Sequence, residues 1–222
     1  MALMIPPTPH ASTSSQGELE IFLKLRDDPG TREWIVLHSL DVANHSKQIS
    51  GEIDFVVIIP FKGVLCIEVK ACHSLVRTQG QWYYGTNSHP DPRGPFKQAS
   101  GAMHSIRHKL VARYPSLSLV LFWSAVIFPY VSFDTRSEEW HAWQVIDSKL
   151  FATCPLGGLL EGILDQARAF LRERPNILWF RPELAEPSIP QCHSIAEVLR
   201  PDFEFFESPK SRRRRQREEL KY

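Results

Sequence analysis

The stretch GEIDFVVIIPFKGVLCIEVK, residues 51–70, holds two β-rich runs on either side of a turn signal. Residues 53–59 and 64–69 are rich in β-branched and aromatic residues, and the PFKG tetrapeptide between them is typical of a hairpin. We therefore predict two strands joined by a tight turn, and the flanking sequence supplies the remaining elements.

Three charged residues stand out in this otherwise apolar hairpin. Side chains alternate between the faces of a strand, so Glu68 and Lys70 share one face, and the hairpin can bring Asp54 beside them. Two carboxylates and an ammonium on one face suit a hard cation with oxygen ligands and a phosphate or water nearby. The alternative is a charged surface at the end of a half-exposed strand, with Glu68 and Lys70 as an ion pair.

The surrounding sequence predicts alternating helices and strands. A helix begins at Ser15, which has capping-box spacing to Glu18, and runs to about Asp28 before Pro29 and Gly30 stop it. Pro95 begins a second helix that ends before Pro115. Further strands are expected at 34–40, 76–84 with a turn or bulge at Gly80, 117–128 and 143–146, and a helix at 156–172. This order predicts an α/β fold with helices packed on a mixed sheet.

Two helical residues are further candidates for the site. Glu18 points along the apolar stripe of the first helix, where an ionised carboxylate needs a partner, but it is also the third residue of the capping box. It is therefore either a metal-site carboxylate or a helix cap. Gln98 lies in the first turn of the second helix, where its amide could hold a phosphate or the ion pair of the site, or could be solvated.

These residues together resemble the NERD (nuclease-related) domain, a branch of the PD-(D/E)XK phosphodiesterases. The likeness spans roughly residues 15–130 and rests on the motifs GE at 17–18, GEID at 51–54, GVLCIEVK at 63–70 and PFKQ at 95–98. It implies a restriction-endonuclease-like mixed β-sheet flanked by helices, and a DNA-directed nuclease that uses Mg²⁺ or Mn²⁺.

The resemblance also implies roles for individual residues. Asp54 and Glu68 would hold the metal, with the backbone carbonyl of Val69 as a further ligand, and Lys70 would orient or activate water. Glu18 would orient a metal-bound water or bind a second ion. Domains of this kind are often joined to superfamily 1 DNA helicases, and many have little demonstrated chemistry. A catalytically idle module that binds nucleic acid or protein is therefore the alternative to an active nuclease.

Composition sets the wider expectations for the 222-residue chain. The formal net charge is only +1, so any phosphate-binding surface must be local, and Arg212–Arg215 form a basic block near the C-terminus. The spacing of the four cysteines suits neither a zinc site nor a disulfide framework, which favours a reducing cytoplasm. No apolar run could span a membrane, no secretory signal is visible, and no Walker motif indicates a nucleotide cofactor.

We expect three regions along the chain. Residues 1–14 are rich in proline and polar residues and are expected to form a disordered lead-in. Residues 15–174 form the nuclease-like domain. Residues 175–222, with frequent prolines and the basic block, are expected to be an accessory C-terminal segment that either contacts DNA or links to a further domain.

Overall fold

The computed structural model describes residues 1–9, 15–45, 48–174, 176–177 and 179–204. The α-helices are α1 (Gln16–Asp27), α2 (Gly94–Arg113), α3 (Ser148–Thr153), α4 (Leu156–Arg172) and α5 (Ile189–Leu199). The strands are β1 (Leu3–Ile5), β2 (Ile35–His45), β3 (Gln48–Ile59), β4 (Gly63–Val69), β5 (Leu75–Thr78), β6 (Gln81–Tyr84), β7 (Phe122–Ile127) and β8 (Val145–Ile146). Short 3₁₀ helices cover Pro29–Thr31, Pro115–Leu117, Ala142–Gln144 and Pro182–Leu184.

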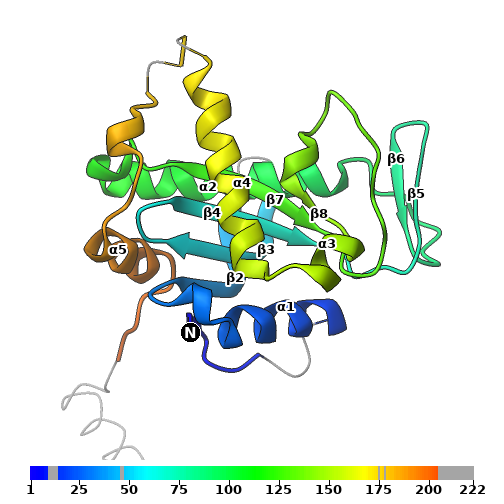
Figure 1. Ribbon diagram of the computed structural model, residues 1–222, viewed down its shortest axis with the longest axis horizontal. Helices are drawn as coiled ribbons and strands as arrows, with labels where there is room; N and C mark the ends of the chain where they lie inside the picture. Colours follow the sequence, from blue (N-terminus) through cyan, green and yellow to red (C-terminus); the bar gives the residue numbers. More distant parts are fainter. Residues whose placement is uncertain (10–14, 46–47, 175, 178, 205–222) are drawn as a thin grey trace, which may run out of the picture.

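Six strands form one mixed sheet in the order β1-β2-β3-β4-β7-β8. The predicted hairpin gives the antiparallel pair β3–β4, and β2 also runs antiparallel to β3. The other three pairs, β1–β2, β4–β7 and β7–β8, are parallel. The predicted α/β architecture with a mixed sheet is confirmed, and the two strands of the hairpin lie at its centre (Figure 1).

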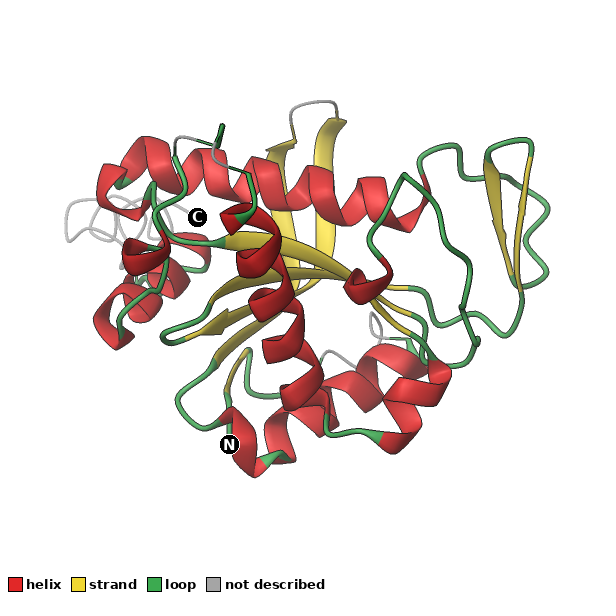
Figure 2. Ribbon diagram, turned by 45° about the horizontal axis from the view of Figure 1, so that its top comes forward, coloured by secondary structure: helices red, strands yellow, loops and turns green. Residues whose placement is uncertain are grey.

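Helices cover both faces of this sheet because its central strands are apolar on both sides. On β4 the alternate residues Leu65 and Ile67 pack in one core with α1 and α4. Val64 and Cys66 pack in a second core with α2 and α5. Figures 1 and 2 show α4 crossing one face of the sheet and α2 lying along the other. A fully apolar strand is expected when both of its faces are covered.

The predicted fourth strand, residues 76–84, is instead a separate two-stranded hairpin. β5 and β6 pair with each other, with Thr78 opposite Gln81, and they do not join the main sheet. Gln79 and Gly80 both have positive φ, of 50° and 77°, which folds the chain back on itself between the two strands. Figure 2 shows this hairpin standing apart from the six-stranded sheet.

The ends of the described chain pack against the sheet. Leu3–Ile5 pairs parallel to β2, and the side chains of Ala2 and Met4 are buried, so the expectation of a disordered lead-in does not hold for these residues. Near the other end, Cys192, Ile195 and Ala196 of α5 are buried in the core shared with α2. Apolar side chains at helical spacing explain this packing, which the frequent prolines obscured in the sequence. The basic block at Arg212–Arg215 lies outside the described residues.

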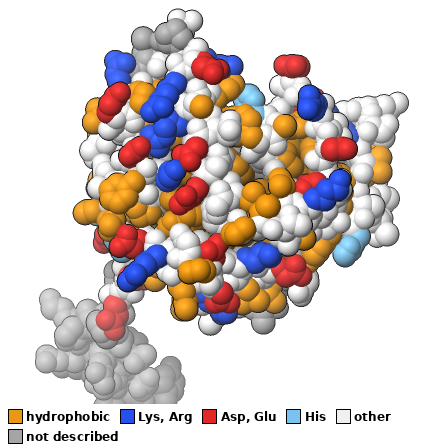
Figure 3. All heavy atoms as spheres, in the orientation of Figure 1, with side chains coloured by type: hydrophobic (Ala, Val, Ile, Leu, Met, Phe, Trp, Pro, Cys, Tyr) orange, Lys and Arg blue, Asp and Glu red, His pale blue; other side chains and the backbone are white. Residues whose placement is uncertain are grey.

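The surface of the face that carries α4 mixes both signs of charge. In Figure 3, Lys and Arg side chains on this face are interleaved with Asp and Glu. An electrostatic footprint for a polyanion requires clustered positive charge, so this face does not provide one. Among the described helices, none combines the length and the hydropathy needed to cross a membrane.

Candidate active site

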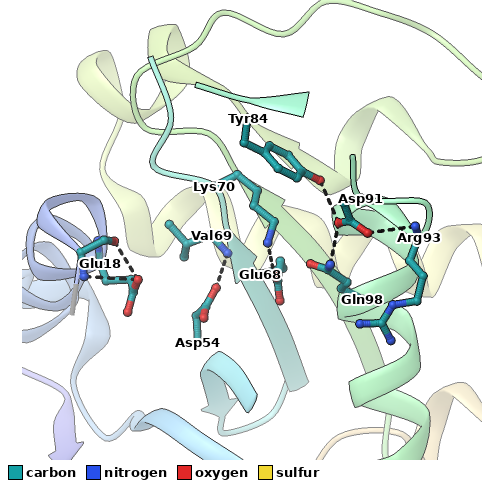
Figure 4. A network of polar contacts seen from close by, with 10 residues as sticks. Glu18, Asp54, Glu68, Val69, Lys70, Tyr84, Asp91, Arg93 and Gln98 are labelled. Atoms are coloured by element: carbon teal, nitrogen blue, oxygen red, sulfur yellow. Dashed lines mark hydrogen bonds and ion pairs between the residues drawn. The ribbon is translucent and has the colours of Figure 1, made fainter. Parts of the chain in front are cut away.

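The hairpin places Asp54 and Glu68 at the same end of the central strand pair. Phe55 of β3 pairs with Ile67 of β4, and the next residues on the two strands are Asp54 and Glu68. The Oδ2 atom of Asp54 accepts a hydrogen bond of 2.6 Å from the backbone N–H of Val69. This bond fixes one oxygen of Asp54 against β4 (Figure 4).

Lys70 follows β4 directly and pairs with Glu68. Its Nζ lies 2.6 Å from Oε1 of Glu68, and its backbone N–H donates to the carbonyl of Ile127 on β7. The ammonium also lies 5.2 Å from the ring centroid of Tyr84, within the range of a cation–π contact. Glu68 is only 8% exposed, so this ion pair is largely removed from solvent.

The electrostatics of the two carboxylates reflect this crowding. Burial, together with repulsion from Glu68 and Glu18, raises the pKa of Asp54 well above its usual range, against the opposing effect of the Val69 N–H. Burial also raises the pKa of Glu68, although Lys70 acts in the opposite direction. It is costly for two neighbouring buried carboxylates to be ionised at the same time. A cation bound between them would stabilise their ionised forms.

Glu18 caps its own helix, as one of the two sequence interpretations expected. Its Oε1 accepts hydrogen bonds from the hydroxyl of Ser15 at 2.7 Å and from the backbone N–H of Ser15 at 3.4 Å, which completes the capping box. It also lies close enough to Asp54 to contribute to the raised pKa of that carboxyl. Glu20, two residues further along α1, instead accepts a hydrogen bond from the hydroxyl of Tyr130. Glu18 is thus a cap that borders the site.

Gln98 is held by a carboxylate that the sequence analysis did not single out. Its Nε2 donates to Oδ2 of Asp91 at 2.7 Å, and the hydroxyl of Tyr84 approaches the same oxygen at 3.4 Å. Because a carboxylate only accepts, this contact fixes the amide orientation. Figure 4 shows the Gln98 carbonyl oxygen on the side of Glu68. Gln98 therefore presents an acceptor toward the ion pair, and its amide N–H is directed to Asp91 rather than to a phosphate.

The signal for Asp91 was the tripeptide Asp91-Pro92-Arg93 just before α2. A short carboxylate followed by backbone donors is typical of an Asx turn, and the Oδ1 of Asp91 accepts from the backbone N–H of Arg93 at 2.9 Å. The backbone of Asp91 also exchanges two hydrogen bonds with Trp82 of β6. The site is therefore assembled from β3, β4, the β5–β6 hairpin and the start of α2.

The oxygen atoms of the site suit a hard divalent cation that needs few ligands from the protein. Asp54 and Glu68 each offer carboxylate oxygens beside the backbone of Val69, and oxygen ligands of this kind are those that Mg²⁺ prefers. Within the described ranges, no three His, Cys, Asp or Glu side chains gather into a metal-binding group. A cation here would depend on two carboxylates, backbone oxygen and water, which is usual for Mg²⁺ because it retains several waters.

A mixed sheet flanked by helices, with an Asp and a Glu-x-Lys at the end of its central hairpin, defines a restriction-endonuclease-like α/β protein. The model of the nuclease-related domain, NERD, matches residues 13–129, which is more than half of the chain. The chain belongs to the NERD family. No curated protein and no solved structure matches it.

Proposed function

We propose that this chain hydrolyses phosphodiester bonds in DNA with the help of Mg²⁺ or Mn²⁺. The observation that carries the proposal is the convergence of Asp54, Glu68 and Lys70 at one end of β3 and β4. Membership of a nuclease-related family supports the same class of chemistry. Asp54 and Glu68 would hold the cation, and the carbonyl of Val69 is a further candidate ligand.

The residues of the candidate site have distinct parts in this reaction. When bound, a divalent cation supplies a Lewis acid that polarises a phosphoryl oxygen and lowers the pKa of water. The Val69 N–H holds Asp54 in place through one oxygen, and the second oxygen accepts no hydrogen bond from the described residues and could bind the cation. Lys70, steadied by Glu68 and the ring of Tyr84, places a positive charge where negative charge develops on the phosphate. The Gln98 carbonyl oxygen offers an acceptor to the same ammonium or to water.

The alternative function is a catalytically idle module that binds nucleic acid or protein beside a helicase. The mixed charge of the face in Figure 3 favours neither function, because a nuclease can bind through a local surface. Many buried ion pairs are also purely structural. The two functions differ in what Lys70 does, which makes this residue the one to change. A reducing, cytoplasmic location would suit either function.

The test is cleavage by the wild-type protein and by Lys70→Ala. Labelled single- and double-stranded DNA and RNA are incubated with Mg²⁺, Mn²⁺ or EDTA. For a nuclease, Lys70→Ala should lower the cleavage rate by about 100-fold or more, since each 1.36 kcal/mol of lost transition-state stabilisation is about tenfold. Binding of the same substrates should fall only slightly, because it rests on several phosphate contacts.

The matched control is Lys62→Ala. Lys62 forms an exposed ion pair with Asp165 at 2.8 Å and takes no part in the site. This variant should cleave at the wild-type rate. If the wild-type protein leaves all four substrates intact in both metals, and also in the presence of a DNA helicase partner, the proposal of an active nuclease fails and the idle module takes its place.

A further inference from the structure

A pocket of about 410 Å³ lies on the other side of α2 from the candidate active site. The α2 residues that line it include Phe96, Ser100 and Arg107. At about 100° per residue, these three lie roughly opposite Gln98 on the helix. The helix therefore separates this pocket from Asp54, Glu68 and Lys70. Its volume is in the range of pockets that bind small molecules.

The pocket opens along an incomplete edge of the sheet. β8 pairs only with Val126 and Ile127, so the first half of β7 has no strand on its outer side. At this place the side-chain amide of Gln144 donates to the carbonyl of Ser124 at 2.9 Å. Phe170 and Leu171 at the end of α4, together with Ile177 and Trp179, close the far side of the pocket.

Aromatic rings form most of its walls. Trp123 of β7 lies 5.8 Å from Phe170 of α4 between ring centroids, and His141 lies 4.3 Å from the same Phe170. Trp179 at the rim is 39% exposed, so part of its ring is accessible from solvent at the mouth of the pocket. Such walls suit a flat, aromatic ligand, because a planar base can stack on aromatic side chains whatever its identity.

Positive charge and unused donors accompany these rings. The guanidinium of Arg107 lies 4.6 Å from the ring centroid of Trp179 and donates one hydrogen bond, of 2.6 Å, to the carbonyl of Ser118. The Nε of Arg107 and the Nε1 of Trp123 are both buried without an acceptor among the described residues. Buried donors are almost always paired, so an acceptor-rich group that reached these two donors would be stabilised beside the pocket.

The remaining charges in the pocket do not cancel that of Arg107. The carboxylate of Glu139 forms an ion pair with Arg77, which offsets its charge. Burial, followed by the charge of Arg107, lowers the pKa of His104 at the rim, and burial followed by Arg174 lowers the pKa of His141. The lowered pKa values favour the neutral imidazole at both positions, which can accept one hydrogen bond and donate another.

We propose that this pocket binds a nucleotide, with the base stacked between its aromatic walls and the phosphate paired with Arg107. Of the ligand classes that combine a flat ring with an anionic, acceptor-rich group, nucleotides match both features of the pocket. A free mononucleotide and the terminal nucleotide of a strand share this chemistry. The site would act independently of the candidate active site.

The test follows the fluorescence of the tryptophans during titration of the wild-type protein with adenosine 5′-monophosphate. Adenosine lacks the phosphate and ribose 5-phosphate lacks the base. Each should bind at least about tenfold more weakly than the nucleotide, since base stacking and the contact with the phosphate each contribute about tenfold to the affinity. A 5′-phosphorylated oligonucleotide, titrated separately, distinguishes the end of a strand from the free nucleotide: tighter binding of either one identifies the source.

Three variants and two controls assign the binding to this pocket. Trp179→Ala and Arg107→Ala should each weaken binding by about tenfold or more. Trp123→Phe, which replaces the indole by a phenyl ring without an N–H, should weaken it measurably. Arg113→Ala changes an arginine of the same helix that packs over Tyr114 outside the pocket, and it should bind as wild type. Lys70→Ala should also bind as wild type, so the result is separate from the fate of the nuclease proposal.

Two results would overturn this inference. One is the absence of saturable binding of every nucleotide up to about 5 mM, the weak end of specific binding. The other is binding that Trp179→Ala and Trp123→Phe leave unchanged. Trp179 is at the surface, so its variant should fold even if Arg107→Ala does not, and a circular dichroism melt checks each protein.

Discussion

At the scale of single residues, the two carboxylates of the candidate site have different partners. Glu68 has the ammonium of Lys70 at 2.6 Å, whereas Asp54 has the N–H of Val69 and forms no ion pair within the part of the chain that the structure describes. Asp54 is therefore the group whose charge is least compensated. A carboxylate that is costly to ionise in the absence of a ligand is a common feature of sites that bind cations.

The first residue-scale prediction concerns Asp54→Asn in EDTA. The neutral amide removes repulsion with Glu68 and still accepts from Val69, so the variant should be more stable than wild type. The gain should be on the order of 1–3 kcal/mol, or about 2–4 °C in melting temperature per kcal/mol for a chain of this size. Adding Mg²⁺ should raise the melting temperature of the wild type only, because the variant lacks a ligand.

The pH dependence of this gain has a definite sign. The pKa of Asp54 is raised in the folded state, so the folded protein keeps a proton that the unfolded chain has already released. Wild-type stability therefore falls as pH rises through that window. In EDTA the advantage of Asp54→Asn should be larger at pH 8 than at pH 5. An equal advantage at both pH values would contradict this account of Asp54.

The second residue-scale prediction links Asp91 to Gln98. If Asp91 acts by orienting the Gln98 amide, Asp91→Ala and Gln98→Ala should each lower cleavage by about tenfold, and the double variant should be no slower than either. A double-mutant cycle on the rate constant measures this coupling. Restoration of activity by Asp91→Asn, which can still accept from Gln98, would distinguish positioning from a need for charge. Additive losses would show that the two residues act separately.

At the scale of elements, the position of α1 depends on a close approach to the segment after Lys70. A Cβ at Gly17 would lie 2.7 Å from the Cβ of Ala71 and 2.8 Å from Cγ of Pro129. Only glycine allows this approach, which brings the N-terminal turn of α1, with Glu18, to the border of the site. The GE pair in the sequence thus has a steric role in its first residue and a capping role in its second.

The element-scale prediction compares Gly17→Ala with Gly158→Ala. Gly17→Ala should cost about 1–3 kcal/mol through overpacking and should weaken the effect of Mg²⁺ on the melting temperature by shifting α1. Gly158 lies in α4, and a Cβ there would meet nothing within 4 Å. Alanine at that position should be neutral or stabilising by about 0.5–1 kcal/mol, since it favours the helix. A stable Gly17→Ala protein would rule out the close approach.

At the scale of the whole molecule, Arg200 connects segments far apart in the chain. Its Nη1 donates to the carbonyls of Ile5 at 2.7 Å and His38 at 3.0 Å, and its Nη2 donates to that of Ser39 at 2.8 Å. One side chain after α5 therefore binds both β1 and β2. The segment beyond residue 174 contributes to the stability of the sheet, in addition to any accessory role it has.

The prediction at this scale is that Arg200→Ala lowers stability by at least about 2 kcal/mol, because three carbonyls lose charge-assisted hydrogen bonds. Chemical denaturation measures this directly. Arg26→Ala, which removes an arginine in a solvent-exposed ion pair with the neighbouring Asp27, should unfold at the same denaturant concentration as wild type. Equal stability of Arg200→Ala and wild type would mean that the end of the described chain does not hold β1 in place.

The sequence by itself determined the elements whose signals are local. A capping box predicted α1, Pro95 predicted the start of α2, apolar spacing predicted α4, and strand alternation gave the shared face of Glu68 and Lys70, because these patterns depend only on near neighbours. The tertiary structure decided what depends on residues far apart in the chain. It separated β5–β6 from the sheet, added β1 and α5 to the core, and brought Asp91 to Gln98. A hydrogen bond between a loop carboxylate and a helix amide leaves no periodic trace in the sequence, so only the folded chain reveals it.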